Sequence, residues 1–246
     1  MKASLTKTAG AASIALLTLA GAASAEERQF EWSVTGTGTS DYIFRGLSLT
    51  NEDPVFQASV DGSYGIWYFG AWGSDLSDNG QVEIDFYTGI KPVLGPVTFD
   101  LGVVYYTYFW DEPSDTNYVE FKLGAEFSPV KNLTLKPVFW YQPEQQDGLY
   151  AEVYTIEGTA AYELPTIGIF SPTISGLVGY TDGDNADTFA TGQDSYTYWN
   201  VGLALAVEKF TFDFRYWDTN LDSVAGDTYF GLDDERFVFT ASVTLP

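Results

Sequence analysis

The sequence predicts an all-β protein, an antiparallel transmembrane β-barrel of about 12 strands. Three observations predict this fold: a leader for export, segments in which apolar and polar residues alternate, and connections that alternate between short and long. The alternation is clearest from Phe237 to Leu245, where every second residue is apolar and most of the others carry a hydroxyl group. Such a strand has one apolar and one polar face. A closed barrel of such strands turns its apolar face to lipid.

The N-terminal segment predicts a signal peptide. Lys2 and Lys7 precede an apolar stretch over residues 11–20, and Ala23-Ser24-Ala25 is typical of a cleavage site. We therefore expect a signal peptide at 1–25 and an outer-membrane β-barrel at 26–246. No later segment has the roughly twenty consecutive apolar residues of a transmembrane helix, which excludes a helical membrane protein.

The strand pattern recurs in about twelve segments, an even number, as single-chain bacterial barrels require. In chain order the predicted strands are 31–44, 54–63, 65–73, 81–91, 96–110, 116–128, 132–142, 149–163, 172–181, 195–208, 209–218 and 235–245.

The connections between these strands alternate in length. The short set is 62–65, 92–96, 128–132 and 208–209, and the longer, polar set is 47–54, 74–80, 111–116, 143–148, 182–194 and 219–234. Short periplasmic turns and longer outer loops are typical of outer-membrane barrels. The connection 164–172 is longer than the others of its class, and we expect a small turn of its own within it.

Aromatic residues near the strand ends indicate girdles at two membrane interfaces, with ordinary β-propensity as the alternative explanation. The girdle expected beside the long loops is Tyr42, Phe44, Phe109, Trp110, Tyr118, Phe139, Tyr141, Tyr180, Tyr198, Trp199, Tyr216 and Trp217. The girdle expected beside the short turns is Trp32, Tyr64, Phe99, Phe127, Tyr162 and Phe210.

Charged residues recur on the polar faces of the predicted strands. A charge facing lipid at depth costs roughly 2–4 kcal/mol, so these residues must face water or one another. The predicted pore-lining residues are Asp41, Arg45, Glu83, Asp85, Asp100, Glu120, Lys122, Glu126, Lys136, Glu152, Asp213, Arg215 and Arg236. Acids outnumber bases in this set, so we expect a pore that prefers cations. The alternative is an interior filled by ion pairs.

Five aromatic residues fall on the same predicted inner faces: Tyr106, Tyr108, Trp140, Tyr154 and Trp217. Their rings offer a surface on which a planar or sugar-like solute stacks. The alternative is that they fill gaps near the strand ends.

The composition excludes several classes of function. Asp and Glu total 34 against 11 Lys and Arg, and such a surface repels nucleic acid. There is no Cys and no His, which removes disulfides, thiolate chemistry, Ser-His-Asp triads and zinc sites of the usual kind. No carboxylate pair of a glycosidase stands out from the strand alternation. We expect no enzyme, no cofactor and no metal site.

The segment from Thr39 to Thr50 carries the most specific motif, T-S-D-Y-I-F-R-G-L-S-L-T. It resembles the opening S-D-Y-x-F-R-G-x-S-x-T signature of the TorF-type porin family, a proteobacterial family of unknown function. The strand from Glu83 to Tyr87 and the aromatic strand after it are similar to that family as well. The resemblance implies an outer-membrane barrel and says little about its solute.

Asp41 and Arg45 lie four residues apart within this motif, on one face of an extended segment. In one interpretation Arg45 pairs with Asp41, or with acids on the next strand, and pins the first outer loop into the lumen as a constriction. In the other, Gly46 ends the strand and Arg45 only caps a turn.

The function that this sequence predicts is a porin-like channel in the bacterial outer membrane, for passive diffusion of small hydrophilic solutes and preferring cations. Expected partners are outer-membrane lipid and lipopolysaccharide, small hydrophilic solutes and the barrel-assembly machinery; a homo-oligomer is compatible with the sequence. One alternative is a non-conducting structural or adhesion barrel that acts through its acidic outer loops. Another is a soluble periplasmic β-barrel binder.

Overall fold

The computed structural model describes residues 29–76, 82–109, 117–145, 152–183, 194–221 and 233–246. The predicted signal peptide, Trp110 and the greater part of the acidic loop 182–194 lie outside these residues. Within the described residues, no helix is long and apolar enough to cross a membrane.

In the described part of the chain, twelve long strands form the wall of the barrel, and three short strands accompany them. The long strands are β1 (Phe30–Thr39), β4 (Val55–Tyr64), β5 (Trp67–Asp75), β6 (Val82–Ile90), β8 (Val97–Phe109), β9 (Tyr118–Val130), β10 (Leu133–Gln142), β11 (Val153–Glu163), β12 (Ser171–Gly183), β13 (Ser195–Val207), β14 (Phe210–Thr219) and β15 (Arg236–Leu245). The short strands are β2 (Ile43–Phe44), β3 (Leu47–Ser48) and β7 (Val93–Leu94).

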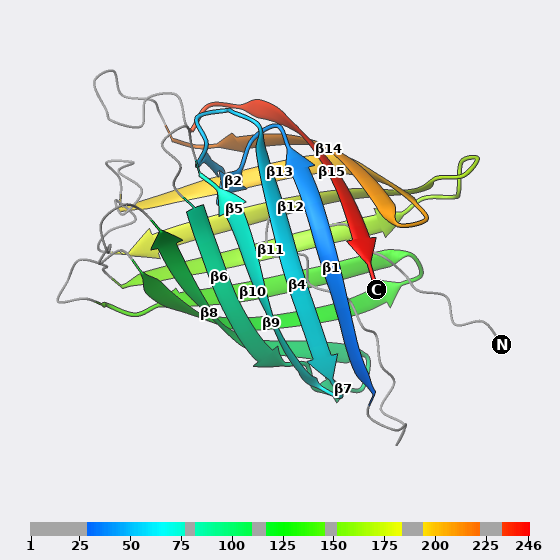
Figure 1. The fold of residues 1–246 in the computed structure, drawn as a ribbon, viewed down its shortest axis with the longest axis horizontal. Coiled ribbons are helices and arrows are strands. Elements are labelled where there is room, and N and C mark those ends of the chain that lie inside the picture. The colour runs from blue at the N-terminus through cyan, green and yellow to red at the C-terminus, as the bar shows by residue number, and fades with distance from the viewer. Residues whose placement is uncertain (1–28, 77–81, 110–116, 146–151, 184–193, 222–232) are drawn as a thin grey trace.

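The sheet closes on itself. Each long strand pairs antiparallel with the next, β6 pairs with β8, and β1 pairs with both β4 and β15. Figure 1 shows the first and last strands, blue β1 and red β15, side by side at this closure. The strands of the front and back walls cross at a large angle, as tilted strands of a barrel do. The predicted twelve-stranded antiparallel barrel is confirmed.

The alternating pattern separates an apolar exterior from a polar interior. On β11, Ile156 is 59% exposed on the outside, whereas its neighbour Thr155 is 1% exposed and points inward. The Thr155 hydroxyl lies 2.8 Å from the hydroxyl of Thr181 on β12. A contiguous exposed apolar surface of this kind requires an apolar surrounding, which a lipid bilayer supplies.

The short connections close through residues with left-handed backbone angles. Gly65, Gly95, Asn132 and Glu208 have φ values of 63°, 61°, 67° and 51°, and each sits in a turn between consecutive strands. The small turn expected within 164–172 is present as well, because Ile167 and Phe170 bridge each other there.

The predicted aromatic girdle beside the long loops is partly wrong. Phe109 and Tyr180 are exposed on the outside, but Tyr118, Tyr198 and Trp217 are buried on the inside. These three side chains fall on the inward parity of their strands, and strand-end position does not determine parity. Tyr42 and Phe44 are not on the wall at all, because β1 ends at Thr39 and the predicted strand 31–44 continues into a segment inside the barrel.

A charge on the outer face tests the membrane position of the barrel. Leu123 lies near the middle of β9 and is 51% exposed on the outer face. Leu123→Arg should lower the free energy of unfolding in lipid vesicles by roughly 2–4 kcal/mol, measured by denaturant titration. The control is Leu94→Arg in the short connection, for which the cost should be roughly 0–1 kcal/mol. Equal costs at the two positions would contradict the assignment of this surface to lipid.

Candidate functional site: the barrel interior

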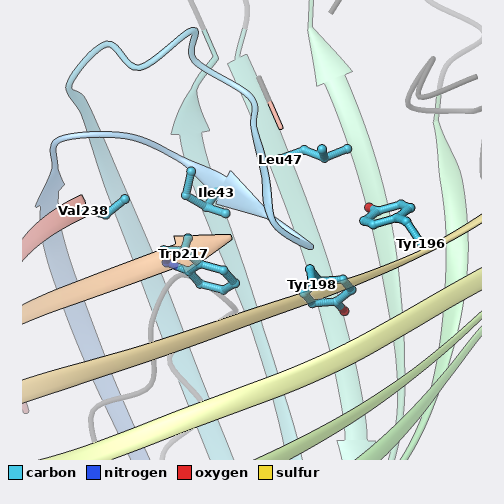
Figure 2. Close-up of a cluster of buried hydrophobic side chains, with 6 residues drawn as sticks. All are labelled: Ile43, Leu47, Tyr196, Tyr198, Trp217 and Val238. Carbon is cyan, nitrogen blue, oxygen red and sulfur yellow. The ribbon is translucent and has the colours of Figure 1, made fainter. Parts of the chain in front are cut away.

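A hairpin between β1 and β4 lies inside the barrel. Its two short strands, β2 and β3, pair antiparallel through residues 43–44 and 47–48. Ile43 and Leu47 are 1% and 5% exposed. They pack in one cluster with side chains of three consecutive wall strands (Figure 2): Tyr196 and Tyr198 on β13, Trp217 on β14 and Val238 on β15. We call residues 40–54 the lumen hairpin.

The tip of the lumen hairpin is a tight turn pressed against the wall. Arg45 and Gly46 have φ values of 49° and 87°. A Cβ atom on Gly46 would lie 2.7 Å from both Thr219 Cγ2 and Tyr198 Cβ. Only glycine combines this backbone conformation with so close an approach, so the motif needs Gly46 at this position.

Arg45 ties the hairpin tip to the opposite wall. Its Nη2 atom donates to both carboxylate oxygens of Glu120 on β9, at 2.8 and 2.9 Å. Tyr106 donates to the same carboxylate at 3.0 Å, and the guanidinium lies 4.7 Å from the ring centroid of Phe44. Both charged side chains are buried. Since β9 lies across the barrel from β1, the hairpin crosses the lumen.

Asp41 holds the base of the hairpin. Its carboxylate accepts hydrogen bonds from the hydroxyls of Ser48 and Thr50 at 2.7 and 2.9 Å. It also pairs with Arg236 on β15 at 3.2 Å. These contacts fix the two arms of the hairpin to each other and to the closing strand.

The structure combines the two interpretations of the Asp41–Arg45 spacing. The hairpin is pinned inward, as the first interpretation held, and Arg45 also takes part in a turn, as the second held. The predicted ion-pair partners were wrong. Arg45 pairs with neither Asp41 nor an acid on the next strand, because its side chain reaches β9 while Asp41 faces Arg236.

Arg215 forms a second buried polar cluster on the β12–β14 wall. It donates to Asp213 at 2.9 and 3.0 Å, to Asn200 Oδ1 at 2.5 Å and to Ser175 Oγ at 3.0 Å. Gly202 lies opposite Arg215 in the strand register and leaves room for the guanidinium group. The charge of Arg215 is therefore compensated within the wall.

Two further ion pairs lie on the β8–β10 wall. Lys122 pairs with Asp100 at 2.8 Å, and Tyr68 donates to the same carboxylate at 2.7 Å. Lys136 pairs with Glu126 at 2.9 Å, and both side chains are partly exposed. The structure thus places these four predicted residues together on the inner wall.

Four inward carboxylates form no ion pair with any described residue: Asp61, Glu83, Asp85 and Glu157. Asp61 accepts hydrogen bonds from Tyr87 and Ser59, and Glu157 accepts them from Trp140 and Tyr198. Glu83 and Asp85, two of the predicted pore-lining residues, lie on the inner face of β6.

The sequence prediction missed Asp61 and Glu157. The alternation of inward and outward residues along each strand could have identified both. Asp61 continues the inner face of Gln57 and Ser59, and Glu157 continues that of Thr155. Among the described residues, no group of three or more acids is arranged to hold a metal ion.

Glu152 and Tyr154 were assigned to the wrong face. Both were expected inside, but Tyr154 is 40% exposed on the outer surface, and Glu152 accepts hydrogen bonds from Tyr154 and Tyr141 there. In the segment 152–157 each face of the strand carries both polar and apolar residues, so the sequence pattern does not show which face points inward. The structure buries Val153, so the face that carries Val153 points inward and the face that carries Tyr154 points outward.

Comparison with known proteins agrees with this architecture. The sequence profile of a family described as "Bacterial protein of unknown function (Gcw_chp)" matches residues 21–245, and the chain belongs to this family. No curated protein has a matching sequence.

Solved porin structures share the fold. The KdgM porin is 8% identical with a TM-score of 0.58, over 87% of this chain and 99% of that one. The NanC porin is 13% identical with a TM-score of 0.54, over 88% of this chain and 100% of that one. At such low identities the likeness shows the fold alone.

Removal of Arg45 tests its link to the opposite wall. Arg45→Ala leaves Glu120 buried without a cation and should lower the free energy of unfolding by roughly 3–5 kcal/mol. Denaturant titration in lipid vesicles measures the change. The double variant Arg45→Met/Glu120→Leu should recover much of the loss, since it removes both charges.

The control for this variant is a more exposed pair at the hairpin base. Glu52, whose side chain is 61% exposed, lies 3.7 Å from Arg236. Glu52→Gln should cost less than about 1 kcal/mol. A similar small cost for Arg45→Ala would mean that the hairpin does not depend on Glu120.

Proposed function

We propose that this chain is an outer-membrane, porin-like channel for passive diffusion of small hydrophilic solutes, and that it is not an enzyme. The observation that carries the proposal is a closed barrel with an apolar exterior and an interior wall of hydroxyl, amide and charged groups. The porin fold of KdgM and NanC supports it. So does the resemblance of residues 39–50 to the TorF-type porin family.

The lumen hairpin narrows the passage and divides its wall into two parts. The wall around β5–β10 carries rings and carboxylates. Strands β1, β12 and β15 carry small hydroxyl residues on their inner faces, among them Ser33, Thr35, Thr173, Ser175 and Thr244. A hydrated solute exchanges hydrogen bonds with such hydroxyl groups at little cost.

The channel prefers cations in this proposal. Arg45, Lys122, Arg215 and Arg236 on the inner wall are each paired with an acid. The four carboxylates without ion pairs give the wall an excess of negative charge, which concentrates cations in the lumen. KdgM has been solved with oligogalacturonate, an acidic sugar chain. An acidic lumen disfavours a solute of that kind here.

Export and membrane insertion complete the proposal. A signal peptide at 1–25 would deliver the chain to the periplasm. The barrel-assembly machinery would then insert it among outer-membrane lipid and lipopolysaccharide, as a monomer or a homo-oligomer.

A second candidate function is a non-conducting barrel that acts through its outer loops. The observation in its favour is the lumen hairpin, which contacts β9 through Arg45 and β13–β15 through its apolar cluster. If these contacts close the passage, the function lies outside the lumen.

Conductance of single channels in a planar bilayer distinguishes the two candidates. The refolded chain should give discrete current steps, with a reversal potential in a salt gradient that indicates cation preference. The double variant Asp61→Asn/Glu157→Gln should shift that potential toward zero, because it removes two uncompensated charges. A silent, correctly folded barrel would reject the channel, and an unchanged potential would reject the selectivity assignment.

Displacement of the hairpin tip tests whether it narrows the passage. Gly46→Ala should lower the conductance, because the added Cβ meets Thr219 and Tyr198 and forces the tip off the wall and further into the passage. Gly38→Ala is the control, since a Cβ there has no atom within 4 Å. Equal conductance for the two variants would show that the hairpin tip does not limit the flow.

A further inference from the structure

Two positively charged side chains inside the barrel are each stabilised by a carboxylate and an aromatic ring. The guanidinium of Arg45 lies 2.8 Å from the carboxylate of Glu120 and 4.7 Å from the ring centroid of Phe44. A carboxylate thus neutralises the charge, while the negative face of an aromatic ring stabilises the flat side of the cation.

Lys122 is held by the same combination on the neighbouring wall. Its ammonium lies 2.8 Å from Asp100 and 5.3 Å from the ring centroid of Trp140. Two different cations of the protein, a guanidinium and an ammonium, therefore each have one carboxylate and one ring. This pairing also suits free organic cations in binding proteins.

Glu83 and Asp85 form a third group of carboxylates beside aromatic rings, and no described residue supplies a cation to it. They lie two residues apart on the inner face of β6 and are 1% and 2% exposed. In the strand register Asp85 has Trp72 on one side and Tyr106 on the other, and Glu83 has Tyr108 beside it. No described base forms an ion pair with either carboxylate.

Polar atoms at this place are unpartnered although they are buried. Oε2 of Glu83, Oδ1 of Asp85 and the side-chain nitrogen of Gln57 have no hydrogen-bond partner among the residues that the structure describes. Gln57 is on the same inner face, in register with Ser74, which is itself in register with Glu83. Two adjacent buried carboxylates with unsatisfied oxygens are strongly unfavourable as a pair of anions, so the place favours either a shared proton or a positive partner.

The lumen hairpin covers this place with Tyr42. The Tyr42 ring stacks edge-on against Trp72 at 5.3 Å and lies beside the two carboxylates. Tyr42 belongs to the hairpin and not to a strand of the wall, so a rotation of its ring leaves the hydrogen bonds of the sheet intact. A solute that displaces this ring would meet two carboxylates and a wall of aromatic side chains.

We propose that Glu83, Asp85 and the rings of Trp72, Tyr106 and Tyr108 form a binding site for small organic cations that carry an ammonium or guanidinium group. The carboxylates accept the N–H groups of the cation, and the rings contact its faces. The inference rests on the proposed channel function, since the solute reaches the site through the lumen.

Isothermal titration calorimetry of the refolded full chain in detergent micelles tests this site, with arginine methyl ester as the probe. The unmodified chain should bind it. Asp85→Asn and Glu83→Gln keep the shape of each side chain and should each weaken binding roughly ten- to hundredfold, because each removes a charge-assisted hydrogen bond. Far-ultraviolet circular dichroism confirms that each variant is folded.

The matched control is Asp61→Asn on β4. Asp61 is also an inward carboxylate without an ion pair, but both its oxygens accept hydrogen bonds, from Tyr87 and Ser59. This variant should bind the probe as the unmodified chain does. Tyr42→Ala should bind it more tightly, because no ring has to be displaced.

Three outcomes would overturn the inference. They are absence of binding to the folded chain, equal binding by Asp85→Asn, and binding of sodium or calcium ions at this place with no binding of the ester. Absence of binding together with channel conductance would reject this site and leave the channel intact. Binding without conductance would reject the channel and retain the site, with access from one mouth of the barrel.

Discussion

A strand within a lipid bilayer must find a hydrogen-bond partner for each backbone N–H and C=O group inside the protein, because the hydrocarbon supplies none. The closure of β1 on β15 and of β6 on β8 meets this requirement by removing both edges of the sheet. Alternate residues then face lipid, so the remaining side chains face inward. The polar interior is therefore a consequence of closure.

Closure also concentrates charge. Nearly every ionic side chain of the wall is forced into one narrow space, where water is limited and an uncompensated charge is costly. Ion pairs along the wall neutralise many of these charges, and the lumen hairpin brings Arg45 to Glu120. The carboxylates of Glu83 and Asp85 on β6 form no ion pair with a described residue. That local excess of acid distinguishes this interior from a fully neutralised core and underlies both the proposed cation preference and the proposed organic-cation site.

The sequence predicted the wall well because strand parity is a local property. The alternation placed Glu83, Asp85, Asp213 and Arg215 on inner faces, as found. It failed in the segment 152–157, where both faces carry polar and apolar residues and only the burial of Val153 separates inside from outside. It also missed the end of β1 at Thr39, since the residues that follow continue to look like a strand while forming the lumen hairpin.

By itself, the sequence determined the barrel, the strands that form it and most of the residues on its inner face, because these follow from a period of two and from turns between neighbouring segments. Only the tertiary structure decided which charges meet. Arg45 and Glu120 are 75 residues apart in the chain, and the pairing of Asp41 with Arg236 exists only because the last strand closes on the first. Partners across a barrel depend on strand tilt, register and the path of an inserted hairpin, and none of these is encoded in the local alternation.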